Sequence, residues 1–177
     1  MISYLGITSL DGYMNDENGN FDWSEPDAEV HEFVNDLERT VGTYLFGRRM
    51  YEVMTAWDTM PAYPDMPYIA DYTRIYQAAD KVVFSTTLTS VNTPRTRLEP
   101  SFTPSFLKTI EGDVSIGGPT LAAQAIHEID EFRMLVSPIS VGGGTPYFPP
   151  GVTLPLELLQ ERRFGNGVVF LRYAPRR

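Results

Sequence analysis

The stretch that decides the fold is VSIGGPTLAAQAI, residues 114–126. A short β-branched run meets two glycines and a proline, and a helical pattern follows. This order is typical of a buried strand that turns directly into a helix, because proline is tolerated in the first turn of a helix. Two explanations for Gly117-Gly118 stay open. Either the helix packs closely on the strand, or an anionic ligand approaches the backbone at the helix end.

A second turn of the same kind lies in TYLFGRRM, residues 43–50, where a strand passes through Gly47 into a helix opened by Arg48 and Arg49. The first N–H groups of a helix are unpaired and attract anions, and arginines add mobile positive charge. Carboxyl ends of parallel strands face one crevice in an open α/β sheet. The pair of turns therefore favours a dinucleotide, although neither turn has the Rossmann or Walker pattern.

Apolar runs alternate with helical patterns along the whole chain, which predicts a single α/β domain over residues 1–177 with a twisted, mostly parallel mixed sheet flanked by helices. The sequence GNG at residues 165–167 predicts a C-terminal antiparallel hairpin. The predicted strands are Ile2–Ile7, Thr43–Phe46, Lys81–Ser85, Val114–Ile116, Phe132–Ser137, Leu156–Phe164 and Val168–Tyr173. Helices are predicted to begin at a capping Ser24, near Arg48 and at Pro119, the last burying Ala122, Ala125, Ile126 and Ile129. The proline-rich residues 55–67 predict a loop.

Composition narrows the function classes. The chain has 177 residues, no cysteine and a net charge of −9, so it lacks thiolate chemistry and the basic stripe of a nucleic-acid binder. A few arginines at defined positions in an otherwise acidic protein suit a small phosphate-bearing ligand. No run approaches the roughly 18 apolar residues of a membrane span, and the first residues read as a strand, so we expect a cytoplasmic protein. His31 and His127 lack metal-ligand spacing, so no metal site is expected.

Five segments in this order resemble the dihydrofolate reductase-like superfamily, which includes the reductase domain of riboflavin biosynthesis. They are TSLDGYMNDENGNFDW (8–23), LFGRRMYE (45–52), KVVFSTT (81–87), VSIGGPTLAAQAI (114–126) and SPISVGGGTPYFP (137–149). The resemblance covers nearly the whole chain. It implies a reductase that uses NADPH, with NADH not excluded, and that transfers hydride to a small, planar heterocyclic substrate. It also implies a homodimer, for which the two long C-terminal strands offer an interface.

The resemblance assigns cofactor residues position by position. The nicotinamide is expected near the end of the first strand and the mobile loop after it, at Thr8, Met14, Gly19 and Asn20. The pyrophosphate is expected between the two turns, at Gly47, Arg48, Arg49, Met50, Gly117, Gly118, Pro119, Thr120 and Leu121. The adenosine end is expected at Ser85, Thr86 and Thr87.

Two departures from the family pattern matter. The family commonly has Ser-Arg where this chain has Ser85-Thr86, so the arginine expected at the 2′-phosphate is missing; Arg49, Arg95 or Arg97 is a hypothetical substitute. Leu5 replaces a lysine of the riboflavin-pathway enzymes, and residues 55–67 differ from their substrate segment. These differences count against a specific pteridine or aminopyrimidine reductase. A non-catalytic nucleotide-binding or ligand-sensing protein on the same fold is the other alternative.

The proton donor is open between Glu29 and Asp27, which both border the apolar face of the first helix. If either acts, burial beside Phe33 and Trp57 would raise its pKa. The alternative is that both are ordinary first-turn acids that stabilise the helix dipole. Trp23, Phe33 and Trp57 are candidates for stacking on a planar substrate, with a core role as the alternative. Asp11 is predicted to cap its own turn.

Overall fold

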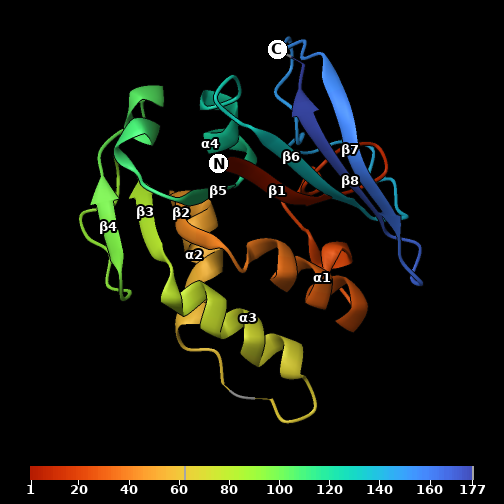
Figure 1. Ribbon diagram of the computed structural model, residues 1–177, viewed down its shortest axis with the longest axis horizontal. Helices are drawn as coiled ribbons and strands as arrows, with labels where there is room; N and C mark the ends of the chain where they lie inside the picture. The colour runs from red at the N-terminus through yellow and green to blue at the C-terminus, as the bar shows by residue number, and fades with distance from the viewer. Residues whose placement is uncertain (62, 177) are drawn as a thin grey trace.

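The computed structural model describes residues 1–61 and 63–176, whose eight strands form one sheet in the order β4-β3-β2-β5-β1-β6-β8-β7 (Figure 1). Neighbouring strands from β4 to β6 run parallel to each other. Strand β8 runs antiparallel to both of its neighbours, β6 and β7. The mixed sheet and the C-terminal hairpin predicted from the sequence are therefore confirmed. The strands are β1 (Ile2–Thr8), β2 (Val41–Gly47), β3 (Asp80–Phe84), β4 (Thr96–Glu99), β5 (Asp113–Gly117), β6 (Glu131–Val136), β7 (Leu156–Arg163) and β8 (Val169–Pro175).

Helices cover both faces of the sheet (Figure 1). Side chains alternate across β2, so Tyr44 and Phe46 pack with the helices of one face, while Leu45 packs with the other. The first face carries α1 (Ala28–Glu38), α2 (Arg48–Met54) and α3 (Pro67–Ala78). The second carries α4 (Pro119–Gln124) and the 3-10 helix η3 (Pro104–Thr109). Two further 3-10 turns are η1 (Asp22–Ser24) and η2 (Thr55–Asp58).

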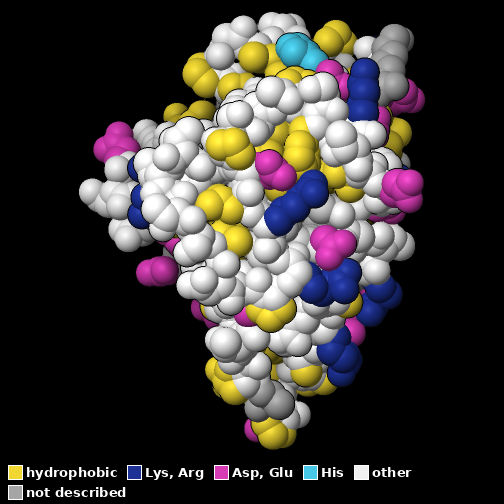
Figure 2. Space-filling view, turned by 90° about the vertical axis from the view of Figure 1, so that its left-hand side faces the viewer, with side chains coloured by type: hydrophobic (Ala, Val, Ile, Leu, Met, Phe, Trp, Pro, Cys, Tyr) yellow, Lys and Arg dark blue, Asp and Glu magenta, His cyan; other side chains and the backbone are white. Residues whose placement is uncertain are grey.

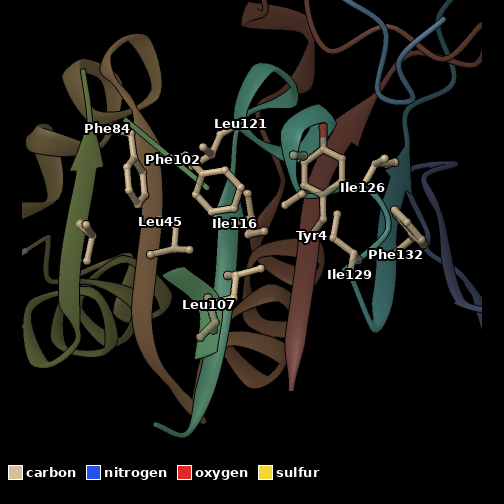
Figure 3. Close-up of a cluster of buried hydrophobic side chains, with 14 of the residues drawn as sticks. Tyr4, Leu45, Phe84, Phe102, Leu107, Ile116, Leu121, Ile126, Ile129 and Phe132 are labelled. Atoms are coloured by element: carbon tan, nitrogen blue, oxygen red, sulfur yellow. The ribbon is translucent and has the colours of Figure 1, made fainter. Parts of the chain in front are cut away.

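The largest buried cluster lies between the sheet and α4 (Figure 3). Tyr4, Ile116 and Phe132 come from three neighbouring strands and are fully buried. Ala125, Ile126 and Ile129 are buried against them as expected, although α4 itself ends at Gln124. Each large apolar side chain that is buried in this way contributes about 1.5–3 kcal/mol, so this cluster fixes the strand ends on which the turns sit.

The structure differs from the sequence prediction in three elements. The first helix begins at Ala28, because Oδ1 of Asp27 accepts the Val30 N–H at 3.0 Å and is the cap; Ser24 ends η1 instead. The loop predicted over residues 55–67 begins with the 3-10 turn η2, and its Ala62 lies outside the described residues. Helix α3 and the short edge strand β4 were not predicted.

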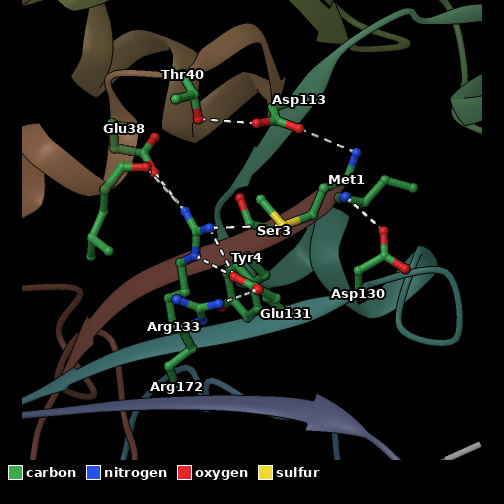
Figure 4. A network of polar contacts seen from close by, with 12 residues as sticks. Met1, Ser3, Tyr4, Glu38, Thr40, Asp113, Asp130, Glu131, Arg133 and Arg172 are labelled. Carbon is green, nitrogen blue, oxygen red and sulfur yellow. Dashed lines mark hydrogen bonds and ion pairs between the residues drawn. The ribbon is translucent and has the colours of Figure 1, made fainter. Parts of the chain in front are cut away.

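A buried network of ion pairs lies at the amino-terminal edge of the sheet (Figure 4). Arg133 of β6 is 5% exposed and pairs with Glu131 at 2.8 Å and with Glu38 of α1 at 3.9 Å. Arg172 of β8 reaches the second oxygen of Glu131 at 2.8 Å. The network joins α1, β6 and β8 at the edge opposite the two glycine turns.

Among the described residues, no helix is both long enough and apolar enough to cross a membrane.

Candidate functional site

The two glycine turns lie side by side. Strands β2 and β5 are parallel neighbours, and Phe46 pairs with Gly117, so Gly47 and Gly118 leave the sheet at the same edge. Met50 in the first turn of α2 lies against the second turn, because a Cβ added to Gly118 would be 3.3 Å from the Met50 Cβ. The prediction that both turns share one edge is confirmed, and strand β3 ends beside them with Phe84 paired to Gly47.

The three glycines of these turns are there for different reasons. A Cβ on Gly117 would lie 2.6 Å from the Phe46 ring, so this glycine is required by packing. Gly118 has φ 90°, a conformation that other residues rarely adopt. Gly47 has φ −77°, and nothing lies within 4 Å of the Cβ it lacks. Neither strain nor packing therefore explains Gly47, which leaves open space over the start of α2.

Positive charge and hydroxyl groups surround this space. Arg48 donates to Glu52 at 2.7 Å and to the Thr87 hydroxyl at 3.1 Å, so it bridges α2 and the segment after β3. The Ser85 hydroxyl accepts the Thr87 and Leu88 N–H groups and shapes that segment. The side chain of Arg49 is exposed and has no ion pair or hydrogen bond to any described residue.

The other arginines considered for the 2′-phosphate lie elsewhere. Arg95 pairs with Asp80 at the amino end of β3, whereas the glycine turns lie at the carboxyl ends, so Arg95 is excluded as a substitute. Arg97 pairs with Glu99 at 3.7 Å and lies over the Phe106 ring. Figure 2 shows the face of the molecule on the β4 side, where Lys and Arg side chains are interspersed with Asp and Glu.

The residues predicted at the nicotinamide do not form one contact group. Thr8 ends β1 and is fully buried, and its Oγ1 has no hydrogen-bond partner within the described part of the chain. Met14 lies beside β1, where its sulfur accepts the Tyr4 hydroxyl at 2.9 Å. Gly19 and Asn20 form an exposed turn closed on Asp16, which accepts both backbone N–H groups.

The loop after β1 is bound to residues 139–147. The Asp11 carboxylate accepts the Ser140 hydroxyl at 2.9 Å and the N–H groups of Val141 and Gly142 at 3.1 and 2.8 Å. The Ser9 side chain, together with these backbone and hydroxyl donors, holds the pKa of Asp11 well below the ordinary range. The Asp11 carboxylate contacts Ser9 in its own turn, as predicted, and also bonds to a segment about 130 residues away, which the sequence did not predict. These bonds join the loop after β1 to the segment that precedes β7.

A cavity of about 190 Å³ lies on the α1 face, beside the ends of β1 and β6. Its lining includes Trp23 from η1, Val30 from α1, and Asn166 and Val168 from the hairpin. Of the three aromatic residues predicted to contact substrate, only Trp23 lines it. The remaining lining residues are Ile7, Ser24, Glu25, Pro26, Leu135, Ser137 and Pro138. The contribution of residue 166 was not found from the sequence, where GNG signalled only a turn.

Phe33 and Trp57 are part of the packing between elements. The Phe33 ring lies edge-on to Phe164 and Phe170, with centroids 5.3 and 4.7 Å away. Trp57 packs edge-on against Tyr72, with centroids 4.7 Å apart, and also contacts His31. Both rings are occupied by contacts with other side chains and take the core role that the sequence left as the alternative.

The two candidate proton donors lie at the surface. Glu29 accepts from Arg162 at 2.9 Å and from the Gly165 N–H at 3.1 Å, and these bonds lower its pKa. Glu29 joins α1 to the β7–β8 hairpin as an exposed acid in the first turn of α1, which is the alternative that the sequence left open, and the burial that a proton donor would need is absent. Asp27 is exposed and caps α1. In the described ranges no group of three or more His, Cys, Asp or Glu side chains could hold a metal ion.

The chain was compared with known proteins by sequence and by structure. No family model matches the chain. The uncharacterized protein YyaP of Bacillus subtilis (strain 168) is 27% identical over 178 residues, which are 96% of this chain and 91% of the relative.

Solved structures are similar over the full length. A protein named for riboflavin biosynthesis from Shewanella sp. PV-4 superposes with a TM-score of 0.75 at 22% identity, over 99% of both chains. Dihydrofolate reductase from Enterococcus faecalis, solved with NADP(H) and RAB-propyl, gives a TM-score of 0.65 at 13% identity, over 100% of this chain and 97% of that one. The strand order, the C-terminal hairpin and these superpositions together show that the chain has the dihydrofolate reductase-like fold.

Proposed function

We propose that this chain is a reductase that binds a reduced nicotinamide dinucleotide across the two glycine turns and acts on a small molecule held in the cavity beside β1. The observation that carries the proposal is the open space at Gly47, next to an unpaired Arg49 and opposite Gly118. A pyrophosphate in that space would meet backbone N–H groups from two helix starts. The Enterococcus faecalis enzyme with the same fold was solved with NADP(H), which supports this choice of cofactor.

Once bound, the cofactor would supply the hydride, and the chain's own residues would bind and position both ligands. Arg48 and Arg49 would bind different phosphate groups of the cofactor. Arg49 is suited to the pyrophosphate that NADPH and NADH share, whereas Arg48 lies at Thr87, where the adenosine end is expected. Arg48 therefore takes the place of the missing Ser-Arg arginine, and NADPH is the preferred cofactor.

The test is a pair of glycine substitutions measured by NADPH binding. Gly47→Ala places a methyl group in the open space, and we expect the dissociation constant to rise at least tenfold. Gly42→Ala is the matched control, because Gly42 lies at the other end of β2 and its added Cβ meets only the Asp113 carbonyl, at 3.8 Å. Thermal melting checks that both variants fold. Equal affinity of Gly47→Ala and the parent protein would contradict the proposal.

Arginine substitutions test the cofactor preference separately. Arg48→Ala should weaken NADPH binding roughly tenfold or more and leave NADH binding nearly unchanged, because a charge-assisted bond contributes about 1.5–3 kcal/mol. Arg49→Ala should weaken both cofactors alike. If Arg48→Ala weakens NADPH and NADH binding equally, as Arg49→Ala should, Arg48 does not recognise the 2′-phosphate.

A second candidate function is nucleotide binding without catalysis. It is favoured by one observation: Glu25 is the only carboxylate among the described residues that line the cavity, and it is exposed. No buried acid is therefore placed to donate a proton. Tight NADPH binding with no cofactor oxidation across a panel of ring compounds would favour this candidate.

The homodimer is proposed to form along β7, the outer strand of the sheet. Its unpaired edge is open, and Leu158 and Leu159 are 47% and 45% exposed at a bulge. Pairing of two such edges would satisfy backbone groups and cover both leucines.

A further inference from the structure

Arg48 is held by hydrogen bonds on two sides. Its Nε donates to Oε1 of Glu52, one helical turn further along α2, at 2.7 Å. Its Nη1 donates to the Thr87 hydroxyl, in the segment after β3, at 3.1 Å. Among the described residues, Nη2 of Arg48 has no hydrogen-bond partner. The guanidinium therefore spans the distance from α2 to Thr87 and keeps one nitrogen available for a ligand.

The segment that carries Thr87 is itself tied to the sheet. The Ser85 hydroxyl accepts the N–H groups of Thr87 and Leu88 at 3.2 and 3.0 Å. The Ser85 N–H donates to the Glu99 carbonyl at 3.0 Å, which continues the pairing of β3 with β4. Arg48 is therefore held between a helix on one side and a turn bonded to the sheet edge on the other.

The contact with Glu52 affects orientation more than stability. The side chains of Arg48 and Glu52 are each 50% exposed, and an exposed pair one helical turn apart contributes little to folding. A free arginine side chain has many rotamers, however, and binding a phosphate group fixes one of them at an entropic cost. Without Glu52, the guanidinium would be held at Thr87 alone.

We propose that Glu52 is a positioning residue that sets the preference for NADPH, because its hydrogen bond to Nε holds Arg48 in the orientation that receives the 2′-phosphate. The inference rests on the proposed function, which assigns Arg48 to the adenosine end of the cofactor. NADH has a hydroxyl in place of that phosphate, so its binding does not depend on the orientation of Arg48. The charge of Glu52 acts in the opposite direction, since a carboxylate near the phosphate repels it.

Two substitutions separate the hydrogen bond of Glu52 from its charge. Glu52→Ala removes both, whereas Glu52→Gln removes the charge and keeps an oxygen that accepts from Nε. Asp36→Ala is the matched control, because it also removes one negative charge from an exposed pair, in which Asp36 lies 2.9 Å from Arg39. Asp36 is near the end of α1, just before β2 begins, so it lies at the edge opposite the glycine turns. Titration calorimetry measures the dissociation constants of NADPH and NADH for each variant.

Glu52→Ala should weaken NADPH binding about threefold to tenfold and leave NADH binding unchanged. Glu52→Gln and Asp36→Ala should bind NADPH at least as tightly as the parent protein. An unchanged ratio of the two dissociation constants in Glu52→Ala, tighter NADPH binding by that variant, or an equal loss in Glu52→Gln would each overturn the proposal. In an Arg48→Ala background, Glu52→Ala should cause no further loss. A further loss there would show that Glu52 does not act through Arg48.

A second readout needs no cofactor. In protein labelled with ¹⁵N-arginine, the Nε–H signal of Arg48 is assigned by its disappearance in Arg48→Ala. This proton should exchange with water about tenfold faster in Glu52→Ala than in the parent protein, and equal exchange rates would overturn the inference. A parent protein that binds neither dinucleotide would refute the proposed function, and the exchange rates would still decide whether Glu52 holds Arg48.

Discussion

Removing Arg133 should destabilise the protein strongly and in a pH-dependent way. Arg133→Met keeps the length of the side chain but deletes the charge that faces Glu131 and Glu38 (Figure 4). Arg172 still pairs with Glu131, whereas no other described cation pairs with Glu38, which is 2% exposed. Breaking a buried pair in this way costs about 3–5 kcal/mol at neutral pH.

The pH dependence follows from Glu38. Burial raises its pKa in the folded protein, and the Ser115 hydroxyl and the Arg133 charge act against that rise. Without Arg133 the folded pKa rises further, so the folded state holds a proton that the unfolded state has released above about pH 4.3. Folded-state stability then falls as pH increases, by up to about 1.4 kcal/mol for each pH unit in that window. The loss caused by Arg133→Met is therefore smaller at pH 5 than at pH 8.

Urea unfolding followed by circular dichroism at both pH values measures these losses. Arg172→Met is the control, because Arg172 is one-third exposed and pairs only with Glu131 among the described acids. It should cost about 1 kcal/mol at either pH. An equal loss for Arg133→Met at pH 5 and pH 8 would refute the assignment of Glu38 as the unpaired acid.

Three further outcomes are expected. Glu29→Gln should lower the melting temperature by about 1–3 °C and leave any turnover unchanged, since the lowered pKa keeps this carboxylate ionised at neutral pH. The contribution of Glu29 to stability should fade as pH falls below about 4.3, and lost turnover with normal melting would restore Glu29 as a proton donor. Asp11→Ala should speed amide exchange at Val141 and Gly142 roughly tenfold; unchanged protection there would show that the loop is held without Asp11. Leu158→Glu should shift light scattering from dimer to monomer, and a dimer that persists would exclude the β7 interface.

The sequence predicted the sheet better than it predicted the side-chain contacts around the candidate site. Gly117-Gly118 and Gly47 signalled strand-to-helix turns because glycine and proline act locally. Helix α3 was missed because residues 55–67 hold the preceding prolines, and its polar residues hide the buried Tyr72 and Tyr76.

The candidate site could be predicted only in part, since its key contacts join distant residues. Arg48 meets Thr87, and Glu29 meets Gly165, across 39 and 136 positions. No local pattern reveals whether an acid near an apolar face is buried, so the sequence left Glu29 open between a buried proton donor and a surface acid of the first turn. Trp23 was a candidate because an aromatic ring can stack on a planar substrate, but its place in the cavity lining depends on η1, α1 and the hairpin meeting in space.

The ion network at the amino-terminal edge has a consequence for how such a protein can change over generations. Arg133, Glu131 and Glu38 tie the helices and strands together at the edge away from the glycine turns and the cavity. Residues at the ligand edge can then be exchanged without breaking the ties on which folding depends. Substitutions at cavity positions such as Trp23 and Asn166 therefore leave this network intact, which makes the chain a suitable starting point for laboratory evolution.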